Sequence, residues 1–349
     1  MTEPLGEAPQ GRPPASPLRR VLRVGFALVA VVLLAVALVR QWDEFVEAVS
    51  RLDVGSVTVS FFAVLVALVL NMLSWREAMA AVGVRTPLVT AARVFYLSQL
   101  GKYVPGSVWP VVAQMELTRD RGVSRLRGAT GAVVSMAVGV VTSASVATLL
   151  LVLPDAEVRA RYWWVAVVIP VMVAALHPAV LRWALGLLLR VTRRSTPVPS
   201  MSGAALTRSA AWSAAMWLAL GGHAWLIADR LAGPDGAPYL TVTGAMTLAW
   251  VVGFLFVVAP AGLGVREGAL VLAMAPVLAP VDALAVALVS RVLMTMGDAL
   301  AAGGAVLAHR RAAPVGTLAT DAGAEASPVP PTSPGVAGSG PVGADSAED

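Results

Sequence analysis

Apolar residues fill long runs of this chain, and short polar stretches separate the runs. A helix needs about 20 consecutive apolar residues to cross the hydrocarbon core of a bilayer. By that measure, about eight segments are predicted to cross: 22–39, 57–82, 128–153, 162–178, 208–230, 240–259, 265–280 and 282–308. The seventh segment is short and is expected to be tilted or partly buried. The pattern predicts an all-α, polytopic membrane helix bundle.

Arginines mark the polar stretches that are expected to face the cytoplasm. They cluster before the first and third predicted spans, between the fourth and fifth, and after the last. Other connecting stretches, such as 43–53 and 233–238, are acidic or of mixed charge. By the positive-inside rule both termini are predicted to be cytoplasmic, which an even number of spans also requires.

One apolar stretch, residues 86–118, does not fit a single crossing because arginines flank it on both sides. Gly101, Pro105 and Gly106 interrupt it near the middle. We therefore expect a re-entrant, broken-helix hairpin near 88–118. Its two half-helices are predicted at 88–99 and 107–118. Non-helical backbone at membrane depth needs protein or a watery cavity around it, so the break predicts a cavity.

Charged residues in and beside this hairpin favour the same cavity. Lys102, the only lysine of the chain, lies at the break, and Glu116 lies in the second half-helix. A charge at mid-bilayer costs about 2.5–3.5 kcal/mol on insertion scales, so it normally faces the protein interior or reaches the interface. Both interpretations stay open for Lys102.

A second break is predicted at 257–270, in the other half of the chain. The break residues are Pro260, Gly262 and Gly264, and the next helix opens with Arg266 and Glu267. Backbone N–H groups at a helix N-terminus, together with an arginine, suit an anion such as phosphate. The alternative is an ordinary loop with a surface ion pair, because this stretch falls at the predicted inner face. Broken helices in both halves are typical of transporters with one central binding site.

The last predicted span carries two charges in apolar sequence, Arg291 and Asp298. Since they are seven positions apart, they lie on roughly one face of the helix. A charge on the interior face of a span is a functional candidate. Arg291 is expected to pair with Glu267 or to meet a lipid phosphate, and a purely structural ion pair is the alternative.

Composition agrees with the membrane assignment and narrows the chemistry. The 349 residues are 57% hydrophobic and 13% charged, whereas soluble domains carry about a quarter charged residues. The net charge of +5 is expected in cytoplasmic loops and does not indicate nucleic-acid binding. The chain has no cysteine, and its three histidines lack metal-ligand spacing, so helix-end or packing roles are expected for them. No metal or cofactor site is predicted.

Segments outside the spans divide the chain into three parts. Residues 1–17 and 312–349 are rich in Pro, Gly and other small or polar residues and are predicted to be disordered cytoplasmic tails. Residues 18–311 form the predicted transmembrane domain. Within it, 42–52 and 179–194 are amphipathic, which is typical of helices that lie on the outer and inner membrane surfaces.

At the two breaks the chain resembles the lysylphosphatidylglycerol synthase transmembrane region, also called the flippase-like domain family. The first shared motif occurs here at Gly101, Lys102, Tyr103, Pro105 and Gly106, followed by Arg119, Gly122, Val123 and Ser124. The second occurs at Pro260, Gly262, Gly264, Arg266 and Glu267, and the resemblance extends to Arg291 in the last span. It covers roughly residues 20–310.

The resemblance implies a multi-pass protein of the bacterial plasma membrane with a cavity for lipid headgroups. In the best-known members this region translocates aminoacylated phosphatidylglycerol, and a separate soluble domain transfers the aminoacyl group. That domain is absent after Arg311, so the chain is not expected to be an aminoacyltransferase or another enzyme. Other relatives accompany polyprenyl-linked sugar pathways.

The favoured hypothesis is a lipid flippase for anionic or aminoacylated phospholipids or polyprenyl-linked lipids. Its candidate headgroup residues are Lys102, Tyr103, Arg266 and Arg291, with Glu267 and Glu116 balancing charge. One alternative is a membrane enzyme acting on lipid-linked substrates, although no D-x-D or histidine cluster supports it. Another is an accessory subunit that binds a separate synthase or glycosyltransferase.

Overall fold

The computed structural model describes residues 39, 42–103, 109–119, 123–152, 156–161, 165–191, 200–256, 262 and 264–312. Within this part of the chain every regular element is a helix, which confirms the all-α prediction. The predicted tails and the predicted first span at 22–39 lie outside the described residues, apart from single residues at their edges.

From Trp42 onward, the described part of the first half of the chain follows the predicted pattern closely. Its helices are α2 (Trp42–Ser50), α3 (Val54–Ala81), α4 (Leu88–Gln99), the short 3-10 helix η1 (Leu100–Tyr103), α5 (Trp109–Arg119) and α6 (Arg125–Val152). The two half-helices of the predicted hairpin are therefore present as α4 and α5, and they pack against each other.

The second half contains shorter helices among long ones. They are α7 (Ala156–Arg161), α8 (Val165–Ala175), α9 (Pro178–Val191), α10 (Gly203–Leu231), α11 (Tyr239–Leu255), α12 (Val265–Met274) and α13 (Pro280–Ala312). α9 is the predicted amphipathic helix, and its apolar Trp183 and charged Arg182 are both exposed. A bend of 68° separates α8 from α9.

Three of the described helices, α3, α6 and α13, are long and apolar enough to cross a membrane, and the bent pair α8–α9 raises this number to four if it is one span. α11 is apolar but has 17 residues, and α12 has ten, so α12 is only about 15 Å long. A polytopic helical membrane bundle fits these lengths. The further crossings needed for eight spans stay a prediction.

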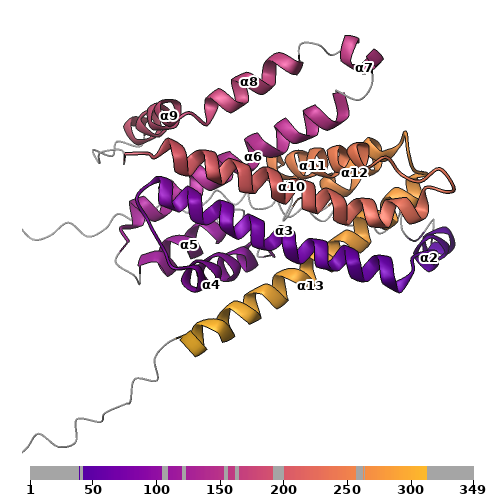
Figure 1. Ribbon diagram of the computed structural model, residues 1–349, viewed down its shortest axis with the longest axis horizontal. Helices are drawn as coiled ribbons and strands as arrows, with labels where there is room; N and C mark the ends of the chain where they lie inside the picture. Colours follow the sequence, from indigo (N-terminus) through magenta and orange to yellow (C-terminus); the bar gives the residue numbers. More distant parts are fainter. Residues whose placement is uncertain are drawn as a thin grey trace, which may run out of the picture. The chain divides into compact units, whose positions relative to one another are not determined.

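The helices α3 and α10 form the most extensive packing contact, and Figure 1 shows them side by side. Small and polar residues let them approach closely, as is common for helices packed in a membrane. The hydroxyls of Ser74 and Ser209 lie 3.2 Å apart, and the hydroxyl of Ser60 lies 2.6 Å from Nδ1 of His223. His223 is fully buried, which agrees with the packing role that was one of the two expected for the histidines.

Two neighbouring glycines of α10 test how tightly the bundle is packed. A Cβ at Gly221 would overlap the side chain of Thr243 on α11, whereas one at Gly222 would meet only Tyr239 at 3.8 Å. We expect Gly221→Ala to lower the free energy of unfolding by about 1–3 kcal/mol because of overpacking. Gly222→Ala, the matched control, should be neutral or stabilising because alanine favours the helix. Thermal unfolding in detergent measures both, and equal midpoints would contradict the packing described.

Charged residues are paired at the two ends of the long helices. At one end Arg51 pairs with Asp282 and donates to the carbonyl of Leu231, so the end of α2, the start of α13 and the end of α10 meet there. The carboxylate of Asp53 caps α3 there, and the donated N–H of Ser56 lowers the pKa of Asp53. At the other end of α3, Arg208 pairs with Glu77 at 2.8 Å. The acidic and mixed connections at 43–53 and 233–238 thus lie beside one end of the bundle.

Candidate functional site

The first break brings the end of α4 against the last helix. α4 tightens into η1 at Leu100–Tyr103, and α5 begins at Trp109. Gly101 lies in η1, whereas Pro105 and Gly106 fall outside the described residues. η1 and α4 both pack against α13. The break therefore presents its polar residues to the interior face of α13, as expected of a hairpin that borders a polar site.

Two residues of η1 bind the same carboxylate on α13. The ammonium of Lys102 lies 2.5 Å from Oδ2 of Asp298, and the hydroxyl of Tyr103 donates to the same oxygen at 2.6 Å. The side chain of Asp298 is 2% exposed, that of Lys102 31%. We call Lys102, Tyr103 and Asp298 the lysine cluster. Lys102 therefore already has the carboxylate of Asp298 as its partner. A headgroup phosphate would share Lys102 with this carboxylate or displace the carboxylate from it.

The second break positions the start of α12. Gly262 and Gly264 have φ angles of +69° and +79°, a region that glycine adopts without strain. Gly262 also lies against the backbone of Gly253, where an added Cβ would come within 3.1 Å. The N–H of Gly264 donates to the carboxylate of Glu267 at 2.7 Å, which caps the helix. Pro260 lies outside the described residues.

Glu267 and Arg291 form an ion pair between α12 and α13, so Arg291 has one of the two partners that the sequence left open. The Glu267 side chain is 4% exposed, so the alternative of a loop with a surface ion pair is wrong. Arg291 lies about 16 Å along α13 from Pro280, and α13 with its 33 residues is about 50 Å long. Arg291 thus lies in the middle third of α13, and α12 starts beside it. For this reason the Glu267–Arg291 pair lies well inside the bundle.

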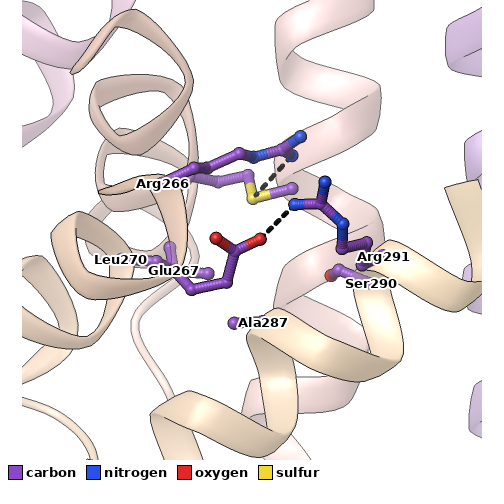
Figure 2. Close-up of a pocket in the computed structure, with 7 residues that line it drawn as sticks. Arg266, Glu267, Leu270, Ala287, Ser290 and Arg291 are labelled. Atoms are coloured by element: carbon purple, nitrogen blue, oxygen red, sulfur yellow. Dashed lines mark hydrogen bonds and ion pairs between the residues drawn. The ribbon is translucent and has the colours of Figure 1, made fainter. Parts of the chain in front are cut away.

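Arg266 lies next to this pair and makes a different set of contacts (Figure 2). Its guanidinium lies 3.4 Å from the sulfur of Met294 and 4.0 Å from that of Met246. Among the residues that the structure describes, no carboxylate pairs with Arg266. Thioethers are weak acceptors and do not neutralise a cation. Arg266 thus keeps an uncompensated positive charge inside the bundle.

A small pocket opens between these side chains, and we call it the arginine pocket. Its lining residues are Met246, Arg266, Glu267, Leu270, Ala287, Ser290 and Arg291. It has room for about one water-sized group, which a single phosphate oxygen would fill. Two arginines and one glutamate line it, so one positive charge exceeds the negative charge there. Such a pocket favours a singly charged anion.

The two breaks meet on one face of α13. Arg291 pairs with Glu267 of α12, and the Thr295 hydroxyl lies 3.4 Å from that of Tyr103. Asp298 binds Lys102 and Tyr103 of η1. These three positions follow each other at four- and three-residue spacing, which places them on successive turns of one helix face. The arginine pocket and the lysine cluster are therefore neighbours along α13.

Other predicted and unpredicted residues complete the site. Glu116 lies on the exposed side of α5 and does not line the arginine pocket, so its charge-balancing role stays a prediction.

Sequence reasoning did not identify Ser290 or the buried His223 as part of the site. Nε2 of His223 lies 2.8 Å from the hydroxyl of Ser290. A histidine within an apolar span was the available signal. In the described part of the chain, no cluster of His, Asp or Glu could hold a metal ion.

Comparison with known families agrees with this geometry. The family model for the lysylphosphatidylglycerol synthase TM region matches residues 22–302. The chain belongs to this family. The match includes both breaks and the positions of Arg291 and Asp298 on α13, so the arginine pocket and the lysine cluster lie inside the family domain. Comparison with curated proteins gave no match. Membership of the lysylphosphatidylglycerol synthase TM family identifies the chain as a membrane protein connected with lipid headgroup metabolism.

Proposed function

We propose that this protein binds a lipid phosphate at the arginine pocket and moves the headgroup across the bilayer without changing it chemically. The observation that carries the proposal is Arg266, a guanidinium inside the bundle whose described contacts are methionine sulfurs. An uncompensated cation at membrane depth is costly, and residues of this kind normally mark a substrate or ion path. An anionic headgroup would supply the missing charge.

The chemistry of the pocket favours a phosphodiester. A phosphodiester carries one negative charge, which equals the excess positive charge of the two arginines over Glu267. A guanidinium offers planar, paired N–H donors that fit phosphate oxygens. Phosphatidylglycerol, its aminoacylated forms and polyprenyl-monophosphate sugars share this group. The pocket itself therefore selects the phosphate, and the rest of the headgroup would extend beyond it.

The broken helices support movement rather than static binding. α12 is about 15 Å long, half of a bilayer core, and both breaks lie against the middle third of α13. A polar headgroup could contact the broken backbone while its acyl chains stay in lipid, since non-helical backbone is tolerated beside a cavity. Broken helices around one central site are typical of transporters. We place the protein in the bacterial plasma membrane, as the family resemblance implies, with both termini cytoplasmic, as its charge pattern predicts.

Reconstitution tests the function directly. Purified full-length protein is placed in phosphatidylcholine vesicles that contain a trace of phosphatidylglycerol with a fluorescent acyl chain. A membrane-impermeant quencher then reports how fast the labelled lipid changes leaflet. We expect exchange at least tenfold faster than in protein-free vesicles, and faster than for labelled phosphatidylcholine, which lacks a net negative charge. Exchange at the protein-free rate, also with aminoacylated and polyprenyl-phosphate probes, would overturn the proposal.

A further inference from the structure

A buried histidine adjoins the arginine pocket and has no part in the proposed binding step. His223 on α10 is fully buried between α3 and α13. Its Nδ1 lies 2.6 Å from the hydroxyl of Ser60 on α3, and its Nε2 lies 2.8 Å from the hydroxyl of Ser290 on α13. Ser290 lines the arginine pocket. One hydroxyl therefore connects the imidazole to the anion site.

The hydrogen bonds define which nitrogen of His223 carries the proton. Nδ1 also lies 3.3 Å from the backbone carbonyl oxygen of Ser60, and a carbonyl oxygen only accepts. The hydroxyl of Ser60 donates to the backbone carbonyl of His223 at 3.0 Å, so its oxygen is left to accept from Nδ1–H. Nε2 is then the basic nitrogen, and it accepts from the hydroxyl of Ser290. The free base of the imidazole thus faces the pocket.

From this geometry we infer that binding of an anionic headgroup is coupled to the uptake of one proton by His223; this inference rests on the proposed function. When Nε2 gains a proton it becomes a donor to the oxygen of Ser290. The hydroxyl hydrogen of Ser290 is then free to turn into the arginine pocket and donate to a phosphate oxygen. Protonation would therefore add a donor to the anion site.

The surrounding charges link the two events. Ionisable groups of the described helices near His223 include Arg291 on α13 and Arg266 and Glu267 on α12, which line the arginine pocket with Ser290, and Tyr239 on α11, which lies beside Gly222. α3 presents the Ser60 hydroxyl to His223. With the pocket empty, the two arginines oppose a third positive charge, and Glu267 offsets only one of them. A bound phosphodiester removes the remaining excess, so anion binding and protonation favour each other.

Calorimetry on the full-length protein in detergent tests this coupling. Short-chain dihexanoyl-phosphatidylglycerol is titrated into the protein in buffers that differ in ionisation enthalpy, between pH 5.5 and 8. We expect uptake of up to one proton per lipid, with affinity rising by up to about tenfold for each unit that the pH falls. The phosphodiester stays ionised over this range, so the titration reports on the protein.

Two histidine variants locate the proton. His223→Gln keeps polar hydrogen-bonding groups but cannot titrate, and it should bind with the weaker, high-pH affinity at every pH and take up no proton. His177→Gln is the matched control, because His177 is exposed and its Nδ1 accepts from Ala179 N–H near the start of α9. This variant should behave like the unmodified protein.

The outcomes separate the two proposals. Binding of the lipid by the unmodified protein with no proton uptake would overturn the coupling and leave the proposed function standing. Proton uptake that survives in His223→Gln would also overturn the assignment to His223. Absence of binding by the unmodified protein at every pH, with aminoacylated and polyprenyl-phosphate lipids as well, would overturn the proposed function, and the coupling with it. The proton count needs no variant, so a misfolded His223→Gln would not hide the answer.

Discussion

Glu267→Gln should lower the free energy of unfolding by about 3–5 kcal/mol, the usual cost of removing one partner of a buried ion pair. The change leaves Arg291 without its carboxylate, so the two arginines of the arginine pocket face each other with no negative charge between them. One glutamine oxygen can still accept from the N–H of Gly264, so the helix cap is partly kept. For a domain of this size the midpoint of thermal unfolding should fall by about 10 °C.

A double variant and a surface pair act as controls for this result. Glu267→Gln combined with Arg291→Met removes both charges and should restore most of the lost stability, because paired removal is often nearly neutral. Glu77→Gln breaks the pair with Arg208, whose side chain is 58% exposed, and should cost at most about 1 kcal/mol. Thermal unfolding in detergent compares all three. If Glu267→Gln and Glu77→Gln destabilise equally, the Glu267–Arg291 pair is not a buried structural contact.

Arg266→Gln should reduce binding and transport of phosphatidylglycerol by at least about thirtyfold while leaving stability unchanged or raised. Loss of a charge-assisted contact to a desolvated anion costs about 2 kcal/mol or more, and every 1.4 kcal/mol is a factor of ten. The variant leaves no described carboxylate unpaired, because Arg266 contacts methionine sulfurs. It also removes an uncompensated charge from the bundle, which is favourable for folding.

Arg266→Gln is expected to weaken lipid binding without lowering stability, and this combination separates a binding role from a structural one. Arg266→Lys should restore part of the binding, since lysine keeps the charge and loses the planar fork of donors. Arg230→Gln is the matched control, because Arg230 forms an exposed pair with Asp53 at 3.3 Å. The measurements are calorimetric lipid binding and the vesicle exchange assay, each with the unfolding midpoint of the same preparation. Exchange at the unmodified rate by well-folded Arg266→Gln would show that the arginine pocket is not the phosphate site.

The order of the helices and the position of the first break follow from the sequence alone. Apolar runs at 57–82 and 128–153 became α3 and α6 with shifts of a few residues. Flanking arginines on both sides of 86–118 predicted a broken hairpin, and α4 and α5 form its two arms. Such features are local: apolar length, glycine and proline positions, and the side of the membrane that arginines prefer. The sequence also named Glu267 as one of two possible partners of Arg291.

The neighbours of the second break were decided by the tertiary structure. α12 begins beside Arg291 of α13, and Glu267 is buried there. Apolar runs define how many residues can cross a bilayer, and they do not show where a short helix starts along a longer neighbour. Gly262 packs closely against the backbone of Gly253 near the end of α11, and this contact helps to position the start of α12.

Partner choice among the charges was also beyond the sequence. Lys102, Arg266 and Arg291 looked equivalent as cations in apolar surroundings. The packing of η1 on α13 pairs Lys102 with Asp298, and the packing of α12 on α13 pairs Arg291 with Glu267. Arg266 then contacts methionine sulfurs. The same packing joined His223 to Ser290 beside the arginine pocket. The sequence by itself determined the helices, the breaks and the kinds of charge, because these depend on neighbours along the chain. Which cation stays uncompensated depends on distances between helices, and only the tertiary structure decides those.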